Sequence, residues 1–366
     1  MAAPLYRTEK KIKPIEAQRP TLSKQDLESV LDCLINDQLN SGALARRFEK
    51  SFASTFGFSN VLAVNSLAGA YHLSLLGLGA GPEDIVLMSV LAPIQACDAT
   101  RYTGARPVVV DIGRESFFPE TDAILETAAA LKDEARKIYF ILDHTFGSPS
   151  TVDTERLKAA GLVIIEDFTG LVGCEKDGAF FGQAGSVAVC GTAEFDLLTT
   201  GNGALVVTPE NKLFQKIHDL RYGGARKENS VAYDYTLEDF QAAMGLVQLS
   251  RLGITLSRRQ KIGQKYLETL RNTKHSSYFA EPGVDSYLRF PVVVDRAHDE
   301  VKRYFNSLQI GITRAVEPAL HRLLGHPGLE YPNGERFFRK SISIPIYPNL
   351  TANNVDRIAA SLRGLL

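Results

Sequence analysis

Asp143 and His144 are the first residues that could do chemistry, because they stand side by side at the end of an apolar run, RKIYFILDH. A carboxylate next to a histidine is a common source of acid–base catalysis. Adjacent residues of a strand point to opposite faces of a sheet, however, so these two cannot easily share a proton. We therefore expect His144 to be structural or to lie near a substrate.

Two other groups of polar residues invite a functional reading. His321 and His326 flank the sequence RLLG, and a spacing of five fits no standard metal-binding pair on a helix. We expect both to be exposed polar residues. Arg258, Arg259 and Lys261 form a basic cluster on a long helical stretch. We expect this cluster to be solvated or to contact another subunit, rather than to bind nucleic acid.

The composition excludes several classes of protein. The chain has 366 residues, with 41 Lys and Arg against 42 Asp and Glu and a formal charge of −1. This balance argues against a nucleic-acid surface spread over the chain. Hydrophobic residues make up 45% and charged residues 23%, which is typical of a globular protein with a full core. No apolar run is long enough to span a bilayer, so we expect no membrane contact.

The N-terminus and the cysteines indicate where the protein works. The first residues, MAAPLYRTEKKIKPIEA, lack the apolar stretch of a signal peptide. The four cysteines stand far apart and make neither a zinc spacing nor a disulfide framework: Cys33, Cys97, Cys174 and Cys190. We therefore expect a cytoplasmic protein with reduced and mostly buried thiols.

Short β-branched runs alternate with helical stretches over the first two thirds of the chain. The runs are NVLAVNS, DIVLMS, ARPVVVDI, RKIYFILDH, GLVIIEDF, SVAVCGT and GALVVTP. This alternation indicates βαβ units around a mainly parallel sheet that is covered on both faces. Ahead of it, residues 23–37 predict a helix with an apolar stripe formed by Leu27, Val30, Leu31 and Leu34.

The pattern changes near residue 236. A long helical stretch, LEDFQAAMGLVQLSRLGITLSRRQKIGQKYLETLRN, is followed by fewer and shorter strands and helices. We predict a large domain over residues 1–240, including an N-terminal arm. Residues 241–366 would then form the long linking helix and a smaller α/β domain.

Nine segments, in this order and spacing, resemble the DegT-type sugar aminotransferases. They are RPTLSKQDLESVLDCL, LNSGALARRFEKSFASTFGFSNVLAVNS, GARPVVVDI, DHTFGSP, VIIEDFTGLVGCE, LLTTGNGALVVTP, LRYGGAR, YDYTLEDFQAAMGLVQLSRL and SISIPIYPNLT. The resemblance covers nearly the whole chain. It implies the fold type I architecture of pyridoxal-phosphate (PLP) enzymes: a large α/β domain with a mainly parallel mixed sheet and a smaller C-terminal α/β domain.

The resemblance also places the residue that should hold the cofactor. In this family a lysine just before a Thr-Thr-Gly-Glu-Gly-Gly run binds PLP as an imine and shuttles the proton. Here the run reads Thr-Thr-Gly-Asn-Gly-Ala, and the matching position is Asp196. A carboxylate cannot form an imine. Within GTAEFDLLTTGNG no lysine and no histidine takes its place.

The family's ring contacts are partly kept. The carboxylate that holds the pyridinium matches Asp167, which is retained after the strand GLVII. Three residues further on, where the family usually has Gln or His, this chain has Gly170. The aromatic side chain that stacks on the ring matches Pro93.

The family's phosphate contacts are mostly lost. A Ser-Gly-Thr helix start becomes Ser66, Leu67 and Ala68. A hydroxyl five residues before the lysine becomes Gly191, and an Asn that reaches across from the neighbouring subunit becomes Asp234. An aspartate facing a phosphate would repel it. We therefore predict no cofactor in this chain, with PLP implied by the family alone.

Two functions remain open at this point. The first is a catalytically degenerate homologue that binds a nucleotide-sugar or another small molecule, or acts as a partner of a pathway enzyme. The second is a working enzyme. It would be a PLP-dependent nucleotide-sugar aminotransferase with an unorthodox lysine, or a dehydratase that takes pyridoxamine phosphate as a loose cofactor, with Asp196 as general base. Both imply a homodimer, because the family builds each site from two chains and the YDYTLEDFQAAMG segment is retained.

Overall fold

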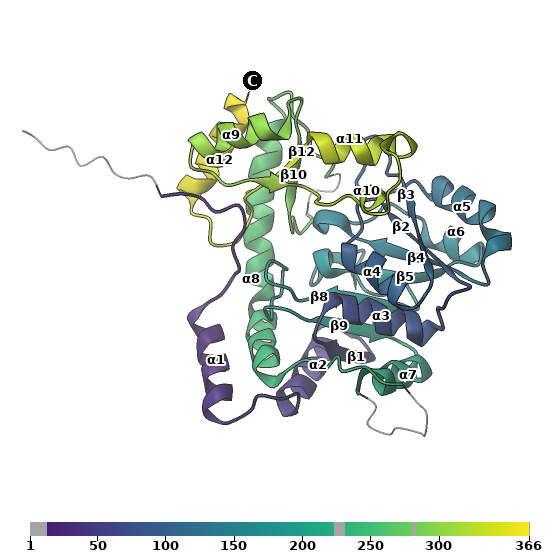
Figure 1. Cartoon of the computed structure of the whole chain (residues 1–366). Helices are drawn as coiled ribbons and strands as arrows, with labels where there is room; N and C mark the ends of the chain where they lie inside the picture. Colours follow the sequence, from purple (N-terminus) through teal and green to yellow (C-terminus); the bar gives the residue numbers. More distant parts are fainter. Residues whose placement is uncertain (1–12, 223–230, 280–282, 366) are drawn as a thin grey trace, which may run out of the picture.

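The computed structural model describes residues 13–222, 231–279 and 283–365 (Figure 1). The expectation that the chain lacks a signal peptide concerns mainly residues 1–12, which lie outside these ranges. The end of the LRYGGAR segment, from residue 223 onward, also lies outside them. Within the described ranges, none of the helices combines the length and apolar character that a membrane crossing requires. All four cysteines are free thiols and are buried, as expected.

A seven-stranded mixed sheet forms the centre of the larger unit. Its order is β1-β9-β8-β5-β4-β2-β3, and only β9 runs against the other strands. The predicted mainly parallel α/β fold is therefore confirmed. The strands are β1 (Asn60–Val64), β2 (Ile85–Ser89), β3 (Arg106–Val110), β4 (Ile138–Asp143), β5 (Val163–Asp167), β8 (Val187–Gly191) and β9 (Ala204–Thr208). A small hairpin, β6 (Glu175–Lys176) with β7 (Ala179–Phe180), follows β5.

Helices cover both faces of this sheet. In β1, Leu62 and Val64 pack into one hydrophobic core, whereas Val61 and Ala63 pack into a second core with residues of α2 and α8. This alternation is what a sheet buried on both sides requires. The helices of this unit are α2 (Ala43–Phe56), α3 (Leu67–Leu78), α4 (Ile94–Tyr102), α5 (Thr121–Ala130), α6 (Thr154–Ala159) and α7 (Asn211–Tyr222).

The long helix α8 (Asp239–Leu270) links this unit to a smaller one, as the sequence predicts (Figure 1). The smaller unit has an antiparallel sheet in the order β10-β12-β11. Its elements are β10 (Phe290–Val293), α9 (His298–Ser307), β11 (Thr313–Arg314), α10 (Leu320–Leu323), α11 (Pro332–Lys340), β12 (Ser341–Ile344) and α12 (Ala352–Gly364). Ile15 pairs with Ile310 and belongs to the core of this smaller unit, so the N-terminal arm packs on the C-terminal half.

The apolar stripe predicted on the first helix does not face the core. In α1 (Lys24–Ile35), Leu27, Leu31 and Leu34 are 67%, 55% and 49% exposed. The buried residues are Asp26 and Cys33, which lie on the side that packs against α8. The helix therefore docks through a polar anchor and not through its leucines.

Asp26 is that anchor, because its buried carboxylate is fully paired. It accepts hydrogen bonds from the Ser23 backbone N–H at 2.7 Å and from the Ser23 hydroxyl at 2.6 Å, which closes the capping box of α1. It also accepts from Gln248 Nε2 at 2.8 Å and lies 3.4 Å from Arg251 Nη1, both on α8. A buried charge satisfied in this way fixes the helix in one register.

We predict that Asp26→Ala lowers the free energy of unfolding by about 3 kcal/mol, because it leaves buried donors of α8 without their acceptor. Urea denaturation followed by circular dichroism measures the change. Asp32→Ala is the matched control, since Asp32 is exposed on the same helix and its removal should cost less than about 0.5 kcal/mol. Equal losses in the two variants would contradict the anchoring role.

Candidate functional site

A cavity of about 610 Å³ lies where the carboxyl ends of β4 and β5 face the smaller unit. Ligand sites of open α/β sheets usually occur at this edge. Asp143 and Asp167, the last residues of the two strands, form part of its wall, and Leu288, Arg289 and residues 315–318 close it from the other side.

The structure brings most of the sequence-predicted site residues to this cavity. Those that line it are Ser66, Leu67, Ala68, Pro93, His144, Asp167, Gly170 and Asp196. Gly191 does not line it but lies directly behind Asp196. Asp234 does not line it in its own chain, where it is exposed and its carbonyl accepts a long hydrogen bond, 3.3 Å, from Asn65.

Asp196 stands in a loop between β8 and β9 and faces the cavity. Its Oδ2 accepts the Ala193 backbone N–H at 2.7 Å. Burial, with a smaller contribution from the nearby Asp167, raises the pKa of the carboxyl to about 6 against the opposing effects of this backbone hydrogen bond, Arg289 and Arg259. The group is thus an anion at neutral pH that takes up a proton in mild acid.

Asp196 leaves little room for a side chain at position 191, which is a glycine. A Cβ placed on Gly191 would lie 2.9 Å from Asp196 Oδ2 and 3.2 Å from Thr169 Oγ1. The Gly191 backbone N–H donates to that threonine hydroxyl at 2.7 Å. The hydroxyl that the family places here therefore has no room beside this aspartate, so the two changes belong together.

Asp167 is held by donors on both carboxylate oxygens. Its Oδ2 accepts from the Tyr71 hydroxyl at 2.5 Å, and its Oδ1 accepts from the Thr169 backbone N–H at 2.9 Å. Burial raises the pKa of Asp167 even so, and it raises the pKa of Tyr71 well above its usual range. The carboxylate is retained, but its near partner is a tyrosine hydroxyl of the same chain.

His144 has both ring nitrogens engaged inside the protein. Its Nδ1 accepts the Ser150 backbone N–H at 3.0 Å, which assigns the proton to Nε2, and Nε2 donates to Glu166 Oε1 at 3.1 Å. Burial works against the charge of Glu166, but the hydrogen bonds from His144 and from the N–H groups of Gly182 and Ala184 hold its pKa below the ordinary value. This arrangement favours the structural role for His144 over a catalytic one.

Gly170 permits two loops to approach closely. A Cβ at this position would lie 2.8 Å from the His144 carbonyl oxygen and 2.9 Å from the Gly147 backbone. The Gln or His that the family usually has here cannot be accommodated in this backbone arrangement. The absence of a ring-contacting side chain is therefore built into the packing of the loops after β4 and β5.

The predicted phosphate-binding turn is a capped helix start without spare side-chain donors. Ser66 is the N-cap of α3, and its Oγ accepts the Gly69 backbone N–H at 3.0 Å. Leu67 and Ala68 bring only backbone N–H groups to the cavity. Pro93, the N-cap of α4, offers no ring for stacking on a pyridine.

The cavity residues that were not singled out from the sequence as ligand contacts include Asp143, Phe146 and Arg289. Asp143 is buried, and desolvation raises the pKa of its carboxyl to about 6, although the Thr145 hydroxyl donates to it. The feature of the sequence that could have identified Asp143 is its position at the carboxyl end of a strand, next to His144. Phe146 adopts φ 60°, which no sequence pattern revealed.

The expectation of a solvated basic cluster was wrong for Arg259, whereas Arg258 and Lys261 are exposed. Arg259 is 3% exposed, and its Nη1 donates to the carbonyls of Tyr287 at 3.1 Å, Leu288 at 3.1 Å and Ile346 at 3.0 Å. Burial lowers the pKa of Arg259 to about 10. The sequence does not distinguish Arg259 from its basic neighbours. Packing buries Arg259, which joins α8 to the cavity wall through Leu288.

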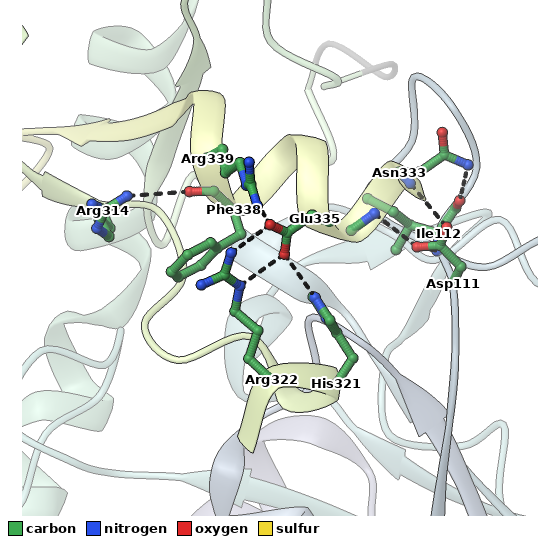
Figure 2. A network of polar contacts seen from close by, with 10 residues as sticks. Asp111, Ile112, Arg314, His321, Arg322, Asn333, Glu335, Phe338 and Arg339 are labelled. Carbon is green, nitrogen blue, oxygen red and sulfur yellow. Dashed lines mark hydrogen bonds and ion pairs between the residues drawn. The ribbon is translucent and has the colours of Figure 1, made fainter. Parts of the chain in front are cut away.

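A polar network fixes the opposite wall of the cavity (Figure 2). Asp111 accepts the backbone N–H groups of Asn333 at 2.9 Å and Gly334 at 2.7 Å, and so caps α11 from the larger unit. Glu335 accepts from His321 at 3.0 Å and pairs with Arg322 and Arg339.

His321 is fully buried in this network, which corrects the expectation that it is exposed. Its ring stacks on Tyr331, and the arginines around Glu335 hold the pKa of that carboxyl near 2, with His321 adding to the effect. Since α10 follows residues 315–318 directly, the network positions that segment over the cavity.

The fold and the cavity define the class of protein to which the chain belongs. Solved structures with the same arrangement include the aminotransferase TlmJ from Streptoalloteichus hindustanus, at TM-score 0.86, 24% identity and coverage of 96% of this chain and 98% of that one. Another is the PLP form of the putative sugar aminotransferase Spr1654 from Streptococcus pneumoniae, at TM-score 0.85, 20% identity and coverage of 96% and 98%. These neighbours confirm the fold type I α/β architecture.

The chain belongs to the DegT/DnrJ/EryC1/StrS aminotransferase family, whose model matches residues 20–363. A curated relative, the uncharacterized protein MJ1066 of Methanocaldococcus jannaschii, is 25% identical over 381 residues, which cover 95% of this chain and 96% of the relative. The predicted family is therefore confirmed, and PLP is the cofactor that this family implies.

We predict that Asp196→Asn raises the free energy of unfolding by about 2 kcal/mol at neutral pH, because the amide keeps the acceptor for Ala193 without a buried charge. The folded state binds the Asp196 proton more tightly than the unfolded chain does. Ionisation therefore lowers stability as the pH rises from 3.8 to about 6, with the full loss above that range. The gain of the variant should shrink between neutral pH and pH 4.

Urea denaturation at several pH values measures this effect. Glu194→Gln, an exposed position in the same loop, is the control and should change stability by less than about 0.5 kcal/mol at any pH. A loss of stability in Asp196→Asn at neutral pH would show that the charge supports the fold.

Proposed function

We propose that this chain is a non-transaminating member of its family that binds a small ligand, such as a nucleotide-sugar, in the cavity without forming a PLP imine. One observation carries the proposal. No lysine lines the cavity in the part of the chain that the structure describes, whereas Asp196, which the sequence resemblance matches to the family lysine, does line it.

The residues of the cavity do not fit a lysine-bound PLP. The lining offers four carboxyl side chains and one guanidinium, so Arg289 is the one cationic side chain that could pair with a phosphate among the described lining residues. The side chain of Ser66 is used as a helix cap, and Gly191 has no hydroxyl to offer. Asp167 alone could hold a pyridinium but does not anchor a cofactor.

The geometry also argues against random loss of a former site. Asp196 is held by a backbone N–H and lies against Gly191, and Gly170 lies against the loop that carries His144. These residues fit one another closely beside a cavity of about 610 Å³. Such packing supports a site adapted to another ligand.

We predict that the purified protein shows no imine absorption band when it is mixed with PLP, because no amine in the described cavity can reach the aldehyde. Borohydride reduction followed by peptide mass mapping is the decisive measurement, and only scattered surface labelling is expected. A stoichiometric pyridoxyl adduct on a single lysine would overturn the proposal.

Asp196→Lys is the informative companion variant. If it gains a stoichiometric adduct, the amine is the one missing element and the other substitutions are tolerated. If it stays unlabelled, the altered phosphate and ring contacts are sufficient to prevent PLP binding.

A second candidate function is an enzyme that takes pyridoxamine phosphate as a loosely bound cofactor, with Asp196 as general base. The observation that favours it is the pKa of about 6 at Asp196, together with the retained Asp167. Turnover of a nucleotide keto-sugar in the presence of pyridoxamine phosphate, abolished in Asp196→Asn, would establish this candidate in place of the first.

The chain is also proposed to form a homodimer, as the retained YDYTLEDFQAAMG segment implies. In the family this segment reaches the neighbouring subunit, and in this structure Asp234 is exposed and lies outside the cavity of its own chain. Both observations are consistent with a site that needs a second copy.

We predict that sedimentation equilibrium at micromolar concentration gives twice the 40.1 kDa of one chain. An obligate interface of this type buries more than about 2,000 Å², which prevents dissociation at that concentration. A monomer under these conditions would refute the dimer.

A further inference from the structure

Three carboxylates of the cavity have no cation within ion-pairing distance in the described part of the chain: Asp143, Asp167 and Asp196. Asp143 and Asp167 are buried, and Asp196 is partly exposed to the cavity. Their hydrogen bonds come from neutral donors. These donors are the hydroxyls of Thr145 and Tyr71 and the backbone N–H groups of Thr169 and Ala193.

Such a group of charges is costly for a folded protein. Burying a carboxylate without a cationic partner is unfavourable, and carboxylates close together raise the cost for one another. Arg259 acts on Asp196 only from a distance, because its guanidinium is occupied by three backbone carbonyls. A ligand that brings a positive charge would offset this cost on binding.

Asp196 has acceptor capacity for such a ligand. Its Oδ2 makes one hydrogen bond, to the Ala193 N–H, and its Oδ1 has no hydrogen-bond donor among the described residues. The Asp196 side chain lines the cavity. A primary ammonium group, with three donors on a compact charge, suits an open carboxylate oxygen.

Arg289 supplies the opposite charge on the wall formed by the smaller unit. Its side chain lines the cavity and makes no ion pair or hydrogen bond within the described residues. The walls of the cavity also include the apolar residues Leu67, Phe146 and Val316. A guanidinium with free donors favours a carboxylate or a phosphate.

We propose that the cavity selects a small molecule that carries a primary ammonium group, paired with Asp196, and an anionic group, paired with Arg289. This inference rests on the proposed function, because a lysine-bound cofactor would occupy the same space. It adds that the bound molecule is the amine-bearing form and that its deaminated counterpart is discriminated against.

The test compares three sugars that differ in one charged group each: glucosamine 6-phosphate, glucose 6-phosphate and glucosamine. Isothermal titration calorimetry at neutral pH measures their affinities for the wild-type protein. We expect glucosamine 6-phosphate to bind at least about tenfold more tightly than either of the other two. Equal affinity for the phosphorylated pair, or no binding of any probe at about 10 mM, would overturn the inference.

Two variants assign each charge to its residue. Asp196→Asn should abolish the preference for the amine while keeping the preference for the phosphate, and Arg289→Gln should do the reverse. Glu194→Gln is the matched control and should bind like the wild type. Circular dichroism verifies that each variant is folded. Preferences that are unchanged in both variants would overturn the assignment.

Failure of this inference is distinguishable from failure of the proposed function. A pyridoxyl adduct after borohydride reduction would refute the absence of the imine, whatever the sugars do. If no adduct forms and the three sugars bind alike, the non-transaminating role stands and the charge assignment is wrong.

Discussion

The guanidinium of Arg259 connects the long helix α8 to the segment that forms one wall of the cavity. It is removed from water, and its desolvation is offset by hydrogen bonds to the carbonyls of Tyr287, Leu288 and Ile346. These carbonyls belong to the segment before β10 and the segment after β12. Because the two strands are antiparallel and Phe290 pairs with Ile344, one side chain of α8 holds two neighbouring segments at the same end of the small sheet. The wall that carries Leu288 and Arg289 is placed by this contact.

A network of hydrogen bonds and ion pairs fixes the cavity wall that residues 315–318 form. The larger unit caps α11 through Asp111, and α11 in turn holds α10 through Glu335, which pairs with Arg322 and His321 (Figure 2). The cavity is therefore bounded by the ends of the parallel strands and by two anchored segments of the smaller unit. A rigid frame of this kind permits the chemistry of the lining to change while the shape persists.

The lining has changed as a set of mutually dependent residues. Asp196 occupies the space that a side chain at Gly191 would need, and Gly170 permits the approach of the loop after β4. By the sequence resemblance, Gly170, Gly191 and Asp196 match positions of the family's cofactor contacts, and in this structure each packs closely against its neighbours. The outcome is a negatively charged cavity in a family whose cofactor is itself an anion.

Much of the architecture was predictable from the sequence. The β-branched runs and the helices between them determined the mainly parallel sheet, and the long helix α8 was evident from its periodicity. Eight of the ten residues assigned to the site by resemblance line one cavity, because the ends of parallel strands converge in any sheet of this type.

What the sequence determined by itself was therefore the order of the elements and the family. The tertiary structure decided which charged residues are buried. Arg259 and His321 resemble surface residues in the sequence, and the leucines of α1 resemble core residues, yet burial is the reverse in each case. Hydrophobic periodicity reports which face of an element is apolar. It does not report whether distant carbonyls or carboxylates satisfy a buried charge, since those partners are brought together only when the chain folds.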